Sequence, residues 1–176
     1  MKEYKEIQVA LLGLGTVGLG VYKVLQMQKE EMQHKIGTEI KIKKILVRNL
    51  EKAAGKIEDA SVLTDSWQEI VNDDEIQIVI EVMGGMEPAR TYIMEAMQAG
   101  KQVVTANKDL IAADGKELMD QAKKSGCDLL FEAAVAGAIP IIRPLKQCLA
   151  GNHLSEIMGI VNGTTNFILT KMAQDG

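Results

Sequence analysis

The chain has 176 residues, 47% of them hydrophobic and 25% charged, and a formal net charge of −4. This composition indicates a globular protein with one sizeable core, and without a basic block it argues against a nucleic-acid partner. The longest apolar runs are strand-length, and the first residues carry acids where a signal peptide is cationic, so we expect a cytoplasmic protein that spans no membrane.

Short runs rich in valine, isoleucine and leucine alternate with longer helical patterns along the chain. In chain order, the patterns predict a strand at 7–13, a helix at 16–33, a strand at 39–48, a short helix at 67–73 and a strand at 76–85. They then predict a helix at 88–99, a strand at 101–106, a helix at 108–126 interrupted near Gly115, a strand at 127–135, a helix after Pro140 and a strand at 153–163. Strands joined by helical crossovers predict an α/β fold with a doubly wound parallel sheet, covered by helices on both faces.

The sequence "GLGTVG" matches the pattern G-x-G-x-x-G at Gly13, Gly15 and Gly18. It follows the first predicted strand and opens a helix, the context in which this pattern marks a Rossmann-type dinucleotide-binding domain. Gly13 permits the turn, Gly15 lets the backbone approach a pyrophosphate, and Gly18 lets the helix pack closely on the strand. The N–H groups around Thr16 and Val17 would then face the phosphates. The alternative is that the glycines serve only a tight turn.

Arg48 and Asn49 stand at the end of the second predicted strand, where many dinucleotide-binding domains carry an acid for the ribose 2′-hydroxyl. Glu39 is acidic, but it stands at the start of that strand and so lies at the wrong end of the sheet. An arginine suits a 2′-phosphate instead. We therefore predict that NADP is preferred over NAD, with a merely solvated cation at Arg48 as the alternative.

Two further stretches fall at the carboxyl ends of predicted strands, the edge at which ligands bind in open α/β sheets. Gly84 and Gly85 would leave room for a nicotinamide ring, or else form an ordinary loop. Thr105 or Asn107 can cap the next helix, but Lys108 then places a cation at a helix N-terminus, against the macrodipole. A lysine here could donate a proton, or place a positive charge beside a carbonyl under reduction.

Metal-binding patterns are weak in the residues themselves. Glu132 ends the fifth predicted strand, and small residues follow it in "FEAAVAGAIPII". One carboxylate with turned-in carbonyls could hold a hard cation, although this spacing alone carries little weight. Cys127 and Cys148 have no metal-ligand spacing, and His34 and His153 stand apart, so no zinc or histidine-based site is predicted.

Four motifs, "GLGTVG", "VTANKDLIA", "FEAAVAGAIPIIRPL" and "GIVNGTTNFILTKM", occur in this order. By these motifs the chain resembles bacterial homoserine dehydrogenase from about Ile7 to Met172. The resemblance implies a reversible reaction in which L-aspartate 4-semialdehyde and NAD(P)H give L-homoserine and NAD(P)+. That step lies on the route to threonine, isoleucine and methionine.

The resemblance also implies roles for particular residues. Lys108 corresponds to a family lysine that lies beside the nicotinamide and the substrate. A structural sodium ion is held in the family by residues that correspond to Glu132, Val135, Gly137 and Ile139. The ion would fix the junction between two domains and take no part in hydride transfer.

The family's enzymes continue past "GTTN" with a region for substrate binding and dimerisation, which carries a second lysine and the acids that hold homoserine. We therefore expect a truncated chain, with an NAD(P)-binding domain at 1–136 and the start of an α+β domain at 137–176. The full-length enzyme is expected to be a homodimer acting on a small molecule. For these 176 residues we expect cofactor binding without full activity. The alternatives are a non-catalytic NAD(P)-binding module or redox sensor, and a Rossmann oxidoreductase for a related semialdehyde or imine.

Overall fold

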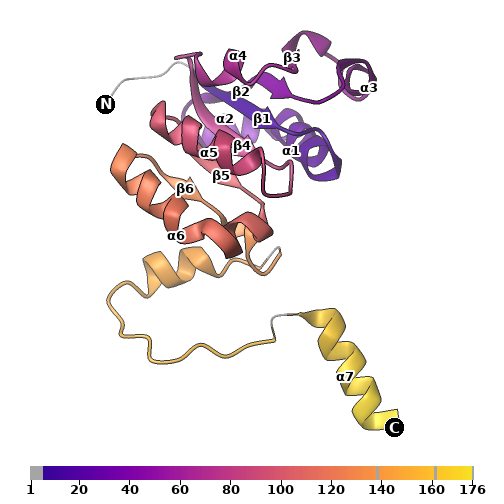
Figure 1. The fold of residues 1–176 in the computed structure, drawn as a ribbon, viewed down its shortest axis with the longest axis vertical. Coiled ribbons are helices and arrows are strands. Elements are labelled where there is room, and N and C mark those ends of the chain that lie inside the picture. Colours follow the sequence, from indigo (N-terminus) through magenta and orange to yellow (C-terminus); the bar gives the residue numbers. More distant parts are fainter. Residues whose placement is uncertain (1–5, 138, 161, 176) are drawn as a thin grey trace.

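The computed structural model describes residues 6–137, 139–160 and 162–175. At its centre is a parallel sheet of six strands in the order β3-β2-β1-β4-β5-β6 (Figure 1). The chain begins in the middle of the sheet, builds outwards to β3, then returns and adds the other three strands on the opposite side. All neighbouring strands are parallel. This strand order is the doubly wound, dinucleotide-binding topology that the sequence predicts.

The strands are β1 (Glu6–Leu12), β2 (Glu39–Leu46), β3 (Leu63–Thr64), β4 (Ile76–Glu81), β5 (Gln102–Thr105) and β6 (Leu129–Leu130). The α-helices are α1 (Thr16–Met27), α2 (Lys29–Ile36), α3 (Leu50–Ala54), α4 (Gln68–Val71), α5 (Ala89–Gln98), α6 (Lys108–Ser125) and α7 (Gly163–Asp175). A short helix with π-type hydrogen bonding spans Pro144–Cys148.

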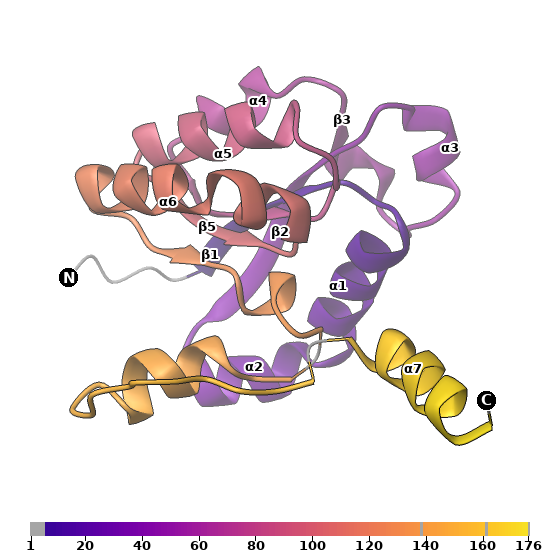
Figure 2. The ribbon, with the colours of Figure 1, turned by 60° about the horizontal axis from the view of Figure 1, so that its bottom comes forward.

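Two apolar clusters lie on opposite faces of the sheet, because successive side chains of a strand point to opposite sides. On β1, Ala10 and Leu12 pack beneath α4, α5 and α6, whereas Leu11 packs on the side of α1 and α3. Figure 2 shows α4, α5 and α6 on one side of the sheet and α1 on the other. The second face is open at its edge, where Leu130 of β6 is 52% exposed. In the described part of the chain, the predicted cover of both faces is therefore incomplete.

Two predictions in the first half of the chain are wrong. The single helix predicted at 16–33 is two helices, which meet at Gln28. Gln28 has non-helical backbone angles, with a φ of −102° and a ψ of 15°, which end α1 before α2 begins. The predicted strands also missed β3, which has only two residues and so cannot show an alternating pattern.

Three predictions in the second half also need correction. Helix α6 is not interrupted at Gly115, since one helical glycine costs only about 1 kcal/mol and α6 buries Leu110 and Leu118 on the sheet side. The strand predicted at 127–135 shortens to β6, followed by a 3-10 turn. No strand forms in the described part of 153–163, from which Val161 is left out, because no neighbouring strand lies there to pair with it.

The residues "GTTN" at 163–166 begin α7. It buries no residue, and Figure 1 shows it apart from the sheet. The chain leaves the sheet after β6, but a domain division at residue 136 stays a prediction. None of the helices within the described ranges is long and apolar enough to cross a membrane.

Candidate functional site

The sheet brings four strand ends into one row. In register, Leu12 is the partner of Leu46 on β2 and of Glu81 on β4, and Glu81 is the partner of Thr105 on β5. The loops after these residues therefore leave the sheet at its carboxyl edge, where ligands bind in open α/β sheets. The residues predicted to bind the cofactor lie in these loops and at the start of the helices that follow them.

The glycine turn after β1 leaves no space for side chains at two of its positions. Gly13 has a φ of +101°, and its N–H donates to the carbonyl oxygen of Leu46 at 3.0 Å, which joins the turn to β2. A Cβ on Gly18 would lie 2.1 Å from the carbonyl oxygen of Gly13, so only glycine fits there. A Cβ on Gly15 would have nothing within 4 Å, so the backbone at this point is open to an approaching ligand.

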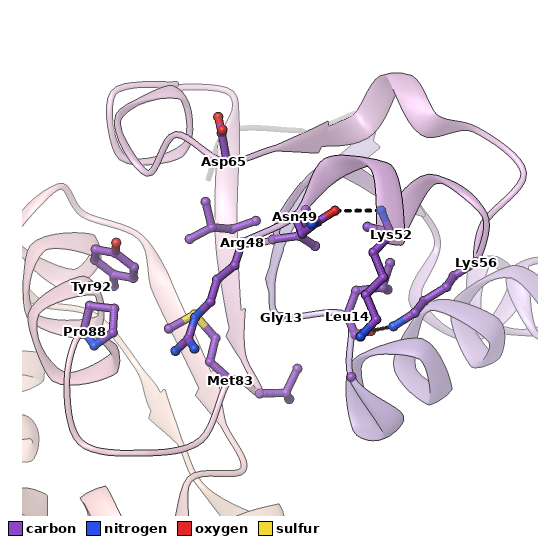
Figure 3. Close-up of a pocket in the computed structure, with 15 residues that line it drawn as sticks. Gly13, Leu14, Arg48, Asn49, Lys52, Lys56, Asp65, Met83, Pro88 and Tyr92 are labelled. Carbon is purple, nitrogen blue, oxygen red and sulfur yellow. Dashed lines mark hydrogen bonds between the residues drawn. The ribbon is translucent and has the colours of Figure 1, made fainter.

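A pocket of about 660 Å³ opens beside this turn (Figure 3). Gly13 and Gly15 line it, and α1 begins directly after Gly15. Thr16 and Val17 are exposed at the start of α1, and first-turn N–H groups have no acceptor within their own helix. A pocket of this volume has the size of a small-molecule or cofactor site.

The charge of the pocket is strongly positive. Arg48, Lys52 and Lys56 line it, and Asp65 is the one acid among its lining residues. Lys56 donates from Nζ to the carbonyl oxygen of Leu14 at 3.0 Å, which holds its charge beside the glycine turn. In Figure 3, Lys52 and Lys56 extend towards Leu14, while Arg48 extends towards the loop after β4. Three cations around one pocket suit a ligand with several phosphates.

An aromatic pair supports the opposite wall of the pocket. Met83, Pro88 and Tyr92 line this wall. The ring of Tyr92 stacks on Trp67 with 4.5 Å between ring centroids. Trp67 also donates from Nε1 to Glu95 at 2.5 Å, so hydrogen bonding and stacking both hold the wall in place. The chain has one tryptophan, and its fluorescence should therefore report on ligands that enter the pocket.

Lys108 and the loop of Gly84 and Gly85 lie together, but outside the lining of this pocket. Both glycines are exposed and have positive φ values, +73° and +77°. Asn107 caps α6 as predicted, accepting a hydrogen bond from the backbone N–H of Leu110 at 3.2 Å. Its Nδ2 atom donates to the carbonyl oxygen of Gly85 at 2.6 Å. Lys108 follows as the exposed first residue of α6, so the lysine and the glycine loop form a second part of the same edge.

Three residues at this edge were not found from the sequence. Lys52 and Lys56 follow Arg48 at intervals of four residues, and that helix-like spacing was the available signal. Glu81 is the single acid of β4, and it is fully buried. A charged residue type at such a position is rare enough to serve as a signal by itself.

Glu132 contacts the chain that leaves the sheet. Its carboxylate accepts backbone N–H groups from Ile141 at 2.5 Å, Ile142 at 2.9 Å and Arg143 at 2.9 Å. Burial raises the pKa of Glu132, but these three hydrogen bonds lower it more, so the pKa lies below its ordinary value. The glutamate therefore stays ionised and caps the short helix that follows.

The predicted cation ligands lie on the loop between this glutamate and that helix. The backbone turns at Gly137, with a φ of +63°, and Ala138 lies outside the described residues. The donor types, one carboxylate and the carbonyls of Val135, Gly137 and Ile139, are those that a hard cation prefers. Since the carboxylate already accepts three N–H groups, the carbonyls would supply most of the coordination. Within the described ranges, no cluster of three His, Cys, Asp or Glu side chains could hold a metal ion.

Two family models match successive parts of the chain. Residues 13–132 match "Homoserine dehydrogenase, NAD binding domain", and residues 140–176 match "Homoserine dehydrogenase". The chain belongs to the homoserine dehydrogenase family. It is similar to the homoserine dehydrogenase of Bacillus subtilis, with 48% identity over 171 residues, which are 97% of this chain and 40% of that protein.

Solved homoserine dehydrogenase structures share the fold. The enzyme from Thiobacillus denitrificans has a TM-score of 0.85 and 47% identity, over 97% of this chain and 39% of that chain. A hyperthermophilic archaeal homoserine dehydrogenase in complex with NADPH has a TM-score of 0.78 and 28% identity, over 97% of this chain and 57% of that chain. The family and the NAD-binding fold predicted from the motifs are confirmed. The chain spans about 40% of the length of the curated relatives it matches.

Proposed function

We propose that this protein is an NADP-preferring homoserine dehydrogenase, which interconverts L-homoserine and L-aspartate 4-semialdehyde on the route to threonine, isoleucine and methionine. The nicotinamide cofactor supplies or accepts the hydride at the aldehyde carbon. The proposal rests on the arrangement of the carboxyl edge in a chain of this family, where a glycine turn opens onto a cationic pocket and Lys108 stands two strands away. The NADPH complex of the archaeal relative supports the class of cofactor.

The residues divide between the two ends of the cofactor. The backbone at Gly13 and Gly15, with the first N–H groups of α1 at Thr16, Val17 and Gly18, receives the phosphates. Gly84 and Gly85 leave room for the nicotinamide ring at the other end. Lys108 then places its positive charge beside the oxygen of the aldehyde and polarises the carbonyl. A lysine beyond the matched residues, implied by the resemblance, supplies the proton.

Further parts of the proposal concern the intact protein. Glu132 and the carbonyls of Val135, Gly137 and Ile139 hold a structural sodium ion, which their donor types support. The chain divides into a cofactor domain at 1–136 and the beginning of a second domain at 137–176. The full-length protein is a cytoplasmic homodimer. The 176 residues by themselves bind cofactor without turnover, because the 171 residues matched to the Bacillus subtilis enzyme make up only 40% of that protein.

A spectrophotometric assay tests the function. Full-length protein should oxidise NADPH with aspartate semialdehyde and reduce NADP with homoserine, while the 176 residues bind NADPH and do neither. A full-length protein that binds NADPH but catalyses neither direction would instead be a non-catalytic binding module or a redox sensor. Turnover with a different semialdehyde or an imine, and none with homoserine, would point to another reaction within the same fold.

Replacing Arg48 by alanine should weaken NADPH binding by about ten- to a hundredfold, because a charge-assisted hydrogen bond to phosphate contributes about 1.5–3 kcal/mol. NADH lacks the 2′-phosphate, so its dissociation constant should change by less than about twofold. Titration calorimetry with both cofactors measures the difference. Lys41→Ala is the control, because Lys41 is an exposed cation on β2, the strand that precedes Arg48, and lies outside the pocket lining. Equal or tighter binding of NADH by the unmodified chain would contradict the proposed preference.

A further inference from the structure

Glu81 is fully buried at the carboxyl end of β4, between the glycine loop and β5. Its Oε1 atom accepts the backbone N–H groups of Met83 at 2.8 Å and Gly84 at 3.3 Å. Its Oε2 atom accepts the hydroxyl of Thr105 at 2.6 Å. One side chain therefore contacts both the loop proposed to receive the nicotinamide and the neighbouring strand.

Thr105 and Asn107 extend these contacts to the start of α6. The hydroxyl of Thr105, which is also fully buried, accepts the backbone N–H of Asn107 at 3.0 Å. Asn107 is 4% exposed, and its Nδ2 atom returns to the carbonyl oxygen of Gly85 at 2.6 Å. The hydrogen bonds thus form a closed circuit from Glu81 through Thr105 and Asn107 to the glycine loop, and back to Glu81. We call these three side chains the Glu81 circuit.

Filling space at this place would not need an acid. Glu81 takes part in none of the ion pairs of the described residues, and moving a carboxyl group out of water is costly. An apolar side chain would fill the same space, but it would leave the N–H groups of Met83 and Gly84 and the hydroxyl of Thr105 without their acceptor. Glu81 also provides directional hydrogen bonds, because its two oxygens fix a loop and a strand relative to one another.

The glycine loop is the element that most needs such a tether. Gly84 and Gly85 are exposed, both have positive φ values, and added Cβ atoms would have nothing within 4 Å. Residues of this kind lose much conformational entropy when a single backbone geometry is required. The other partner of the circuit, Asn107, directly precedes Lys108. The hydrogen bond that holds Asn107 against Gly85 therefore also holds the backbone of Lys108 close to the loop.

We propose that Glu81 is a positioning residue for the nicotinamide end of the site: through Thr105 and Asn107 it holds the glycine loop and Lys108 in one geometry. The inference rests on the proposed function for the role of Lys108. It adds a residue that touches neither cofactor nor substrate, and acts through the two groups that do. The adenosine end shares Met83 with this circuit, but its cations Arg48, Lys52 and Lys56 are not among the side chains that form it.

The circuit can be opened at Thr105 without removing bulk. Thr105→Val keeps the shape and deletes the hydroxyl, whereas Thr105→Ser keeps the hydroxyl. Two probes distinguish the ends of the site: NADPH reaches both, and adenosine 2′,5′-bisphosphate reaches only the adenosine end. In the 176-residue chain, Thr105→Val should weaken the binding of NADPH by about tenfold and change the affinity for the bisphosphate by less than about twofold. Thr105→Ser should bind both probes as the unmodified chain does. Trp67 fluorescence and titration calorimetry report the two affinities.

Turnover of the full-length enzyme distinguishes positioning from a purely structural role, because kcat should change only if the circuit positions Lys108. Misplacing Lys108 should lower kcat by about ten- to a hundredfold in Thr105→Val, with a smaller change in the KM for homoserine and with recovery in Thr105→Ser. If Thr105→Val does not fold, Asn107→Ser takes its place, because serine keeps a capping oxygen for α6 and loses only the Nδ2 donor to Gly85.

The outcomes separate the two proposals. Equal weakening of both probes, or unchanged kcat in a folded variant, would overturn the positioning role of the Glu81 circuit. An unmodified chain that binds neither probe, or a full-length enzyme without homoserine turnover, would instead overturn the proposed function. The inference is supported if Thr105→Val weakens the binding of NADPH but not of the bisphosphate and lowers kcat, and if Thr105→Ser restores both properties.

Discussion

Replacing Lys108 by methionine in the full-length enzyme should lower turnover with homoserine by at least about a hundredfold. Methionine keeps the length and the apolar stem of the side chain but removes the charge that polarises the reacting oxygen, a contribution of about 10²–10⁴ for groups of this kind. Because Lys108 is exposed at the first position of α6, its loss should leave the fold intact. Steady-state kinetics and the melting temperature measure the two effects separately.

Lys116→Met is the matched control for this prediction. Lys116 is a second exposed lysine on α6, two turns further along the helix. Its replacement removes the same charge from the same helix and should leave turnover within about twofold. If turnover of Lys108→Met also stays within about tenfold, roughly 1.4 kcal/mol of barrier, a catalytic Lys108 is untenable.

Replacing Gly18 by alanine should destabilise the chain by about 3 kcal/mol and abolish cofactor binding. The new Cβ would lie 2.1 Å from the carbonyl oxygen of Gly13 and 2.9 Å from its carbonyl carbon, both of them backbone atoms that cannot rotate away. Relief requires α1 to move off β1, which opens the phosphate turn and disturbs the core. Urea denaturation and NADPH titration measure the two losses.

The same helix supplies the control. Gly20 also lies in α1, but a Cβ there meets nothing within 4 Å. Gly20→Ala should therefore stabilise the chain by about 0.5–1 kcal/mol, as expected for alanine in a helix, and leave NADPH binding unchanged. If both alanine variants have the same stability and the same affinity for NADPH, close packing of α1 on the turn is not the reason for a glycine at position 18.

The sequence predicted the sheet well because the central strands β1 and β4 are largely buried and so appear as nearly continuous apolar runs. It also placed the glycine turn, since the steric need at Gly18 allows one residue type. The N-cap at Asn107 was also predictable, because the capping side chain and the backbone N–H that it accepts lie three residues apart. Each of these features depends on residues close together in the chain.

Elements that depend on distant partners were predicted less well. The short strand β3 exists because β2 offers it a backbone ladder at Ile45 and Leu46. The strand expected at 153–163 has no such neighbour among the described residues and does not form. The cation role of Glu132 stays a prediction, whereas the hydrogen bonds from Ile141 and Arg143 to its carboxylate appear only in the folded chain.

By itself, the sequence determined the fold class, the family and the position of Lys108 at a strand–helix junction, because these follow from local pattern and motif. The tertiary structure alone decided which groups surround that junction. Glu81, Thr105 and Gly85 lie 27, 3 and 23 residues before Lys108 in the chain, and parallel pairing of β4 with β5 brings them together. Hydrogen bonds between strands depend on register, which no single segment of sequence encodes.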